Sequence, residues 1–234
     1  MSEKSDALAV PVDVTMRRPT LFGVPAMPIL AAPLVVRRAQ VEEAGALAAL
    51  LGRAFEAEVW DAAGTERELF GDETVRATLV VAAEGRLVAT ASLQVRPDVP
   101  ECGWVRWVAT ERDRRREGLA RALLSGVLAM AGQAGCREAR LHTQTDRLAA
   151  IRLYVQLGFE PLVRGDPDRE VWERVLRLLS GEAGGGRVGT PAGSRGAAPE
   201  EPMLRAEGNN VNRTGVFRRG RDIVEGYVRL RERA

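Results

Sequence analysis

The sequence is poor in the residues that build metal sites and disulfide frameworks. Its 234 residues include a single histidine, His142, and two cysteines, Cys102 and Cys136. One histidine excludes a multi-histidine metal centre, and two cysteines without ligand spacing form neither a zinc motif nor a disulfide framework. Both cysteines lie close to apolar stretches. We therefore expect no metal and two buried, reduced thiols.

Long apolar runs are also missing. The stretch 21–36 is apolar, but Pro25, Pro28 and Pro33 interrupt it, and it is too short to span a bilayer. A polar, acidic start precedes it, unlike the basic start of a secretory signal. We expect a cytoplasmic protein that has no membrane partner.

An excess of charge of one sign is absent as well. The 34 basic and 32 acidic residues leave a formal net charge of +2, and Lys4 is the only lysine. This balance argues against a dedicated nucleic-acid binder, so nucleic acid is not an expected partner. Hydrophobic residues make up 45% of the chain and can form a sizeable core.

Composition divides the chain into four segments. Residues 1–33 lack clear periodicity and predict an extended arm lying on the domain surface, whereas 34–180 show alternating strand and helix patterns. Residues 181–200 are dominated by Gly, Ala, Pro and Ser and predict a flexible linker. The tail 201–234 is arginine-rich. Disorder and a partner-binding role both stay open for it.

Within the central segment, the apolar spacing changes between the strand and helix periods. Glu84-Gly85 is a hairpin turn signal between two Val-, Leu- and Thr-rich stretches. Asp166-Pro167 predicts the start of a last helix, with a strand ending at Leu179 as the alternative. The predicted strands are 34–38, 78–83, 86–95, 103–110, 137–143 and 159–163, and the predicted helices are 41–55, 65–70, 119–134 and 148–157.

The stretch that begins at Thr110 predicts an anion site. A strand runs into a short arginine-rich turn, then Gly118, then a long helix. The start of a helix leaves backbone N–H groups unpaired and presents the positive end of the helix dipole, an arrangement that suits phosphate. Gly118 allows close approach of the ligand, and Arg115 and Arg116 add charge suited to a pyrophosphate. A solvated charged turn is the alternative on these residues alone.

Two patterns together resemble the signatures of the GNAT superfamily. Arg115-x-x-Gly118-x-Ala120 follows a predicted strand and resembles the acyl-CoA-binding motif, and AAIRLYVQLGFEP at 149–161 resembles the helix that ends in Leu-Tyr-x-x-x-Gly-Phe. The resemblance covers about residues 34–179. It implies an α/β layered fold, the GNAT fold, with a mixed, mostly antiparallel central sheet splayed at its centre and helices on both faces.

The resemblance also implies a site for acetyl-CoA as co-substrate, without a metal. The pantetheine arm would pair with the end of the strand at Val108, Ala109 and Thr110. Arg147 stands where many members have an asparagine, and it could still contact the cofactor. Arg112 replaces a proline common in the loop. The pyrophosphate would be held by the backbone amides of Arg115, Arg116, Glu117, Gly118, Leu119 and Ala120.

The implied activity is N-acetyl transfer to a primary amine of a small molecule or peptide. Tyr154 matches the tyrosine that often protonates the departing thiolate, although a packing role is the simpler alternative. Glu101 is one candidate base, with a surface glutamate and a water chain as alternatives. The tryptophans Trp60, Trp104 and Trp107 line either the acceptor side or the core. A degenerate acyl-CoA-binding sensor and a homodimer also stay open.

Overall fold

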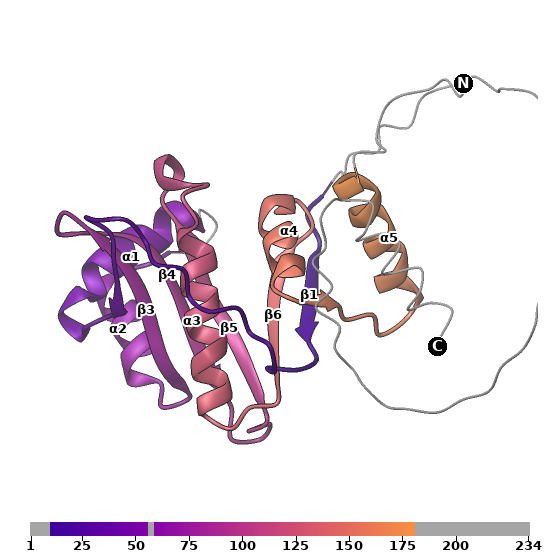
Figure 1. Cartoon of the computed structure of the whole chain (residues 1–234), viewed down its shortest axis with the longest axis horizontal. Helices are drawn as coiled ribbons and strands as arrows, with labels where there is room; N and C mark the ends of the chain where they lie inside the picture. Colours follow the sequence, from indigo (N-terminus) through magenta and orange to yellow (C-terminus); the bar gives the residue numbers. More distant parts are fainter. Residues whose placement is uncertain (1–9, 56–58, 181–234) are drawn as a thin grey trace, which may run out of the picture. The chain divides into compact units, whose positions relative to one another are not determined.

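The computed structural model in Figure 1 describes residues 10–55 and 59–180. The predicted linker 181–200 and tail 201–234 lie outside the described residues. The elements up to Val175 form one compact unit, and a second unit begins at Leu176. None of the described helices is long and apolar enough to cross a membrane.

A seven-stranded sheet organises the first unit, in the order β2-β3-β4-β5-β6-β1-β7. Every neighbouring pair is antiparallel except β5 and β6, which are parallel. The sheet is therefore mixed and mostly antiparallel, as expected. Its strands are β1 (Asp13–Arg18), β2 (Val35–Arg38), β3 (Val75–Ala83), β4 (Arg86–Val95), β5 (Cys102–Thr110), β6 (Glu138–Gln144) and β7 (Glu160–Pro161).

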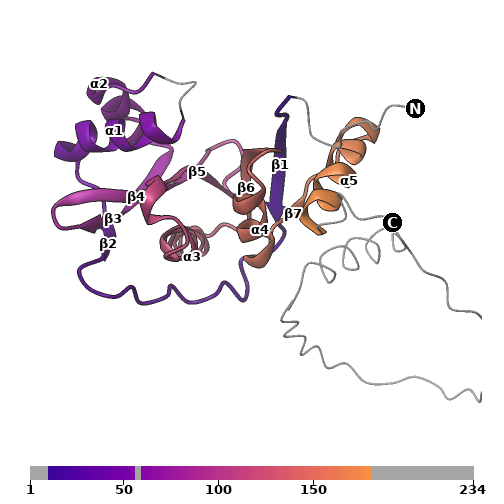
Figure 2. The same ribbon diagram turned by 90° about the horizontal axis from the view of Figure 1, so that it is seen from above.

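Helices cover both faces of this sheet, with α1 and α2 on one face and α3 and α4 on the other (Figure 2). A 3₁₀ turn, η1 (Val41–Glu43), precedes α1, and a π-helical turn, η2 (Arg67–Gly71), follows α2. The final helix proves to be a helix rather than a strand. The helices are α1 (Ala44–Ala54), α2 (Ala62–Glu66), α3 (Leu119–Gln133), α4 (Leu148–Gln156) and α5 (Asp166–Ser180).

The core follows from the apolar spacing of these elements. Leu47, Leu50 and Leu51 recur at helical spacing on α1, and they pack with Val80 of β3 and Ala109 of β5. The amphipathic face of α1 therefore covers the central strands, and it lies beside the end of β5. The two cysteines are buried and free, and burial raises the pKa of the Cys102 thiol to about 12.

The N-terminal segment differs from the expected surface arm. Residues 13–18 form β1, which lies between β6 and β7 and pairs with both. Met16 is completely buried, and Val14 is nearly so. The expectation of a surface arm is wrong for these residues because the strand's partners lie far along the chain, where no local pattern indicates them.

The last residue of β1 is a buried arginine. Arg18 donates hydrogen bonds to the carbonyl oxygens of Leu157 and Phe22. Leu157 is the C-cap of α4, where a cation stabilises the unpaired carbonyl groups of a helix. Gly158 follows at φ +83°, and a Cβ there would overlap the Arg18 guanidinium. The N-terminal strand thus holds the end of α4, the helix that carries Tyr154.

Candidate active site

A slot opens where β5 and β6 diverge. The two strands pair only from Cys102 to Val105 on β5 and from Glu138 to Leu141 on β6, although both strands continue further. A pocket of about 210 Å³ lies in this divergence, with β5 residues 105–108 and β6 residues 141–144 among its lining. The sheet is therefore splayed at its centre, and the gap between the diverging strands contains a pocket.

A β-bulge in β5 lies beside this pocket. Thr90 of β4 is opposite Ala109 and Ser92 is opposite Arg106, so that β5 has one more residue than β4 over this stretch. Trp107, within the bulge, has φ +49°. A bulge increases local twist and redirects side chains, which accounts for Arg106, Trp107 and Val108 all lining the pocket.

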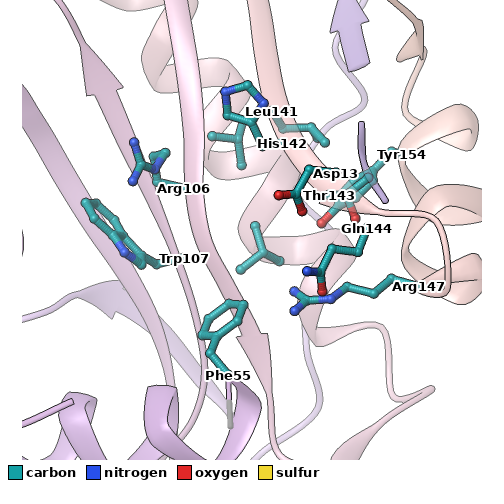
Figure 3. Close-up of a pocket in the computed structure, with 12 residues that line it drawn as sticks. Asp13, Phe55, Arg106, Trp107, Leu141, His142, Thr143, Gln144, Arg147 and Tyr154 are labelled. Carbon is teal, nitrogen blue, oxygen red and sulfur yellow. The ribbon is translucent and has the colours of Figure 1, made fainter. Parts of the chain in front are cut away.

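Tyr154 of α4 reaches the pocket from the face opposite α1 (Figure 3). Its ring packs edge-to-face on Phe159, with the ring centroids 6.0 Å apart. Burial raises the pKa of the Tyr154 phenol to about 12, and the nearby Arg147 guanidinium opposes this shift. The phenol is therefore protonated at neutral pH and is able to donate a proton within the slot.

The arginine-rich loop joins the end of β5 to α3. A 3₁₀ turn, η3 (Arg112–Arg114), follows β5, and Gly118 is the N-cap of α3 at φ +81°. This left-handed backbone suits glycine, and apart from its chain neighbours no described residue lies within 4 Å of the position that a Cβ would occupy. The helix N-terminus is therefore open to a ligand.

A known protein family matches the part of the chain that forms this site. The model of the acetyltransferase (GNAT) family matches residues 46–159, which include the splayed strands, the loop and α4. The chain carries a GNAT acetyltransferase domain. Comparison with curated proteins gives no match.

Several solved structures are similar to this chain. A GCN5-related N-acetyltransferase from Sphaerobacter thermophilus is 24% identical, with a TM-score of 0.55, over 65% of this chain and 49% of that one. A GNAT-family acetyltransferase structure from Novosphingobium aromaticivorans is 26% identical, with a TM-score of 0.49, over 66% and 61%. A transcriptional regulator from Bacillus halodurans is 19% identical, with a TM-score of 0.50, over 57% and 97%. The chain thus spans about half to three fifths of the length of the first two.

The residues predicted to bind the cofactor lie along the GNAT slot and its loop. Val108 lines the pocket, Ala109 is buried against α1, and the Thr110 hydroxyl is buried without a hydrogen-bond partner among the described residues. In the loop, Arg115 and Arg116 are exposed, whereas Leu119 is buried in the core. Leu119 therefore has only its backbone available to a ligand.

Glu117 and Arg147 both already have side-chain contacts. The Glu117 carboxylate accepts two hydrogen bonds from Arg114, at 2.8 and 2.9 Å. Arg147 lies at the N-cap of α4, and its guanidinium lies 5.1 Å from the Phe55 ring centroid. Phe55 follows α1, so this contact joins the two sides of the pocket (Figure 3).

Glu101 is not brought to the pocket. It is exposed just before β5, and its carbonyl oxygen accepts from the backbone N–H groups of Arg137 and Glu138. The lining of the pocket begins four residues later, at Val105, which corresponds to about 13 Å along a strand. Glu101 and Tyr154 therefore lie apart, and the geometry gives no support to Glu101 as the base.

The three tryptophans have different surroundings. Trp107 lines the pocket, and Trp60 packs edge-to-face on it, with the ring centroids 6.5 Å apart. Trp104 stacks on His142, with a centroid separation of 4.9 Å and an interplanar angle of 29°. Trp107 therefore lines the slot directly, while Trp60 and Trp104 support residues that do so.

His142 is the main site residue that the sequence did not indicate. It lines the pocket from β6, and its Nδ1 lies 3.0 Å from the Thr15 hydroxyl of β1. Partial burial lowers its pKa, as do the cations Arg106 and Arg164, while Asp13 opposes them. The imidazole is thus neutral at neutral pH. The available signal in the sequence was that His142 is the only histidine.

Asp13, Phe55 and Arg106 also line the pocket without having been predicted to do so. Asp13 comes from β1, which was expected on the surface, and Phe55 ends a helix whose apolar spacing indicates only core packing. The described residues include no group of three or more His, Cys, Asp or Glu side chains arranged to hold a metal ion.

Proposed function

We propose that this chain is an N-acetyltransferase that moves an acetyl group from acetyl-CoA to a primary amine by direct attack. The observation that carries the proposal is the protonated phenol of Tyr154 inside the pocket between the diverging strands. A family match over residues 46–159 supports the same reaction class. The two substrates would meet in one slot, which makes the attack effectively intramolecular.

The residues present fit acetyl-CoA. The edge of β5 from Arg106 to Thr110 has no ladder partner on β6, so it offers backbone groups to the pantetheine arm. The buried Thr110 hydroxyl lacks a partner among the described residues and is a further candidate donor. At the start of α3, the backbone amides from Arg115 to Ala120 would hold the pyrophosphate.

Acetyl-CoA would supply the acetyl group as a thioester, whose carbon–sulfur bond breaks as the new carbon–nitrogen bond forms. Tyr154 would give its phenolic proton to the departing sulfur. Because the raised pKa keeps the phenol protonated, its proton is available when the thiolate develops beside it. The charge of Arg147 would stabilise the phenolate left after this transfer, because it opposes the rise in the pKa of Tyr154.

The amine must lose a proton, and we assign this proton to His142 instead of Glu101. Thr15 contacts Nδ1 and Trp104 stacks on the ring, which together fix the imidazole in the pocket. In the tautomer whose Nδ1–H donates to the Thr15 hydroxyl, Nε2 carries the lone pair and is the nitrogen that accepts the proton. A neutral imidazole has the required lone pair, and its lowered pKa is consistent with that state.

The test is a calorimetric titration with acetyl-CoA followed by a thiol-release assay on a panel of amines. We expect binding, and CoA release that depends on an amine. Absence of acetyl-CoA binding would refute the proposal. Binding without CoA release across the panel would favour an acyl-CoA-binding sensor.

A further inference from the structure

Arg106 is held in one orientation by Gln94 and Trp107. Its Nη1 donates to Oε1 of Gln94 at 3.2 Å, and its guanidinium carbon lies 4.6 Å from the Trp107 ring centroid. The Gln94 amide is fixed in turn, because it donates to the hydroxyl of Thr74 at 2.9 Å and to a carboxylate oxygen of Asp72 at 3.4 Å. A guanidinium supported in this way loses little further freedom when it binds a ligand.

The charge of Arg106 is not neutralised by an ion pair with a carboxylate of the described residues. Asp72 is occupied by hydrogen bonds from Thr74 and Gln94, which lower its pKa together with the charge of Arg106. Among the described residues that line the pocket, Arg106 and Arg147 are cationic, and Asp13 is the one carboxylate. The described lining of the pocket therefore carries a net positive charge.

This positive charge is separate from the pyrophosphate cradle proposed above. None of the loop residues 115–120 lines the pocket that Arg106 lines. Figure 3 shows Arg106 and Trp107 on one wall, across from His142 and Tyr154. An anion at Arg106 would therefore lie beside the reacting groups and not beside the cofactor phosphates.

We infer that the acceptor is a small amine that also carries a carboxylate, as an amino acid does, and that Arg106 binds this carboxylate. The inference rests on the proposed function. The planar guanidinium presents paired N–H donors that match the two oxygens of a carboxylate. The carboxylate takes no part in the transfer: it fixes the orientation of the acceptor while the amine is acetylated and loses its proton.

The test compares each L-amino acid with its own carboxamide in the thiol-release assay. The pair shares the amine and the side chain and differs in the anionic charge. We expect kcat/KM to be about 10- to 100-fold higher for the acid, the range that a charge-assisted hydrogen bond supports. Arg106→Gln should remove this preference, mainly by raising KM for the acid, and Arg106→Lys should restore part of it.

Arg96→Gln is the matched control. It removes an exposed arginine that is paired with Asp98, and Arg96 does not line the pocket, so the preference should be unchanged. Acetyl-CoA affinity, measured by titration, reports whether each variant retains its cofactor site.

Three results would overturn the inference. They are equal kcat/KM for acid and amide, an unchanged preference in an Arg106→Gln variant that binds acetyl-CoA normally, and turnover confined to amines without a carboxylate. The last of these leaves the proposed transferase function standing. Absence of acetyl-CoA binding to the unmodified chain would refute the transferase function itself, and the calorimetric titration measures this binding separately.

Discussion

Replacing Tyr154 with phenylalanine removes one hydroxyl group from the slot and leaves the ring in place. The ring contact with Phe159 does not involve the hydroxyl, so the packing of α4 should survive. We expect the free energy of unfolding to change by less than about 1 kcal/mol, because only one polar atom is lost. Tyr154→Ala, in contrast, should cost about 3–5 kcal/mol because it leaves a cavity in the core.

The effect of Tyr154→Phe on turnover should be much larger than its effect on stability. The phenol has a pKa of about 12, so it is protonated at any pH suited to the assay and its loss removes a donor that is always present. General acid catalysis contributes about 10²- to 10⁴-fold to the rate, and we expect kcat to fall by that factor. Acetyl-CoA affinity should stay near that of the unmodified chain, because the loop at Gly118 is untouched.

The assay is CoA release at saturating acetyl-CoA, with the dissociation constant measured separately by calorimetry. Thr143→Val is a matched control, since it removes a hydroxyl from a buried residue on the β6 wall of the same pocket. We expect it to change kcat by less than about 10-fold, below the range for general acid catalysis. Near-normal turnover of Tyr154→Phe would refute the reasoning and leave Tyr154 as a packing residue.

Three other measurements test separate parts of the site. Gly118→Glu should weaken acetyl-CoA binding by at least about 10-fold in calorimetry, since it places negative charge at the helix N-terminus. The control is Gly135→Glu, which has a similar φ of +86° beyond the other end of α3 and should leave the affinity unchanged. Equal effects of the two variants would contradict our placement of the loop. For His142, the base must be neutral, and burial lowers its pKa, so the unmodified chain should lose activity as pH falls through a pKa below the ordinary histidine value. His142→Gln should abolish that acid limb, and an identical pH profile would exclude the role. Gly158→Ala should lower the free energy of unfolding by about 1 kcal/mol or more in chemical denaturation, because its φ of +83° disfavours a side chain and the Arg18 guanidinium must shift to admit the new Cβ; an unchanged midpoint would contradict the left-handed backbone at this glycine.

The sequence predicted the local elements well because their signals are local. The hairpin around Glu84-Gly85 and the helix after Gly118 lie close to the expected residues. A strand repeats every two residues and a helix every 3.6 residues, so both patterns can be recognised within a short stretch of sequence. The final helix from Asp166 was also predicted, because the expected cap, Asp166, and the proline after it are adjacent in the chain.

The pocket was less predictable because it depends on contacts between distant segments. Asp13 enters it, and Thr15 contacts His142, through the pairing of β1 with β6, which no short window of sequence contains. Arg106 is redirected by a bulge that appears only when β5 is set against β4. Glu101 was suggested by its nearness to the strand in sequence, but the strand carries it away from the slot.

The position of β1 has a consequence for the order in which the molecule is assembled. The side chains of Thr15, Arg17 and Arg18 bond to partners 121 to 139 residues later in the chain, so β1 takes its place only when distant segments meet. Contacts of such long separation are slow to form, because the intervening loop must be closed first. Until then the β6 edge is unpaired and a ready partner for another chain. Until β1 has paired, α4 therefore lacks the Arg18 contact that holds its end.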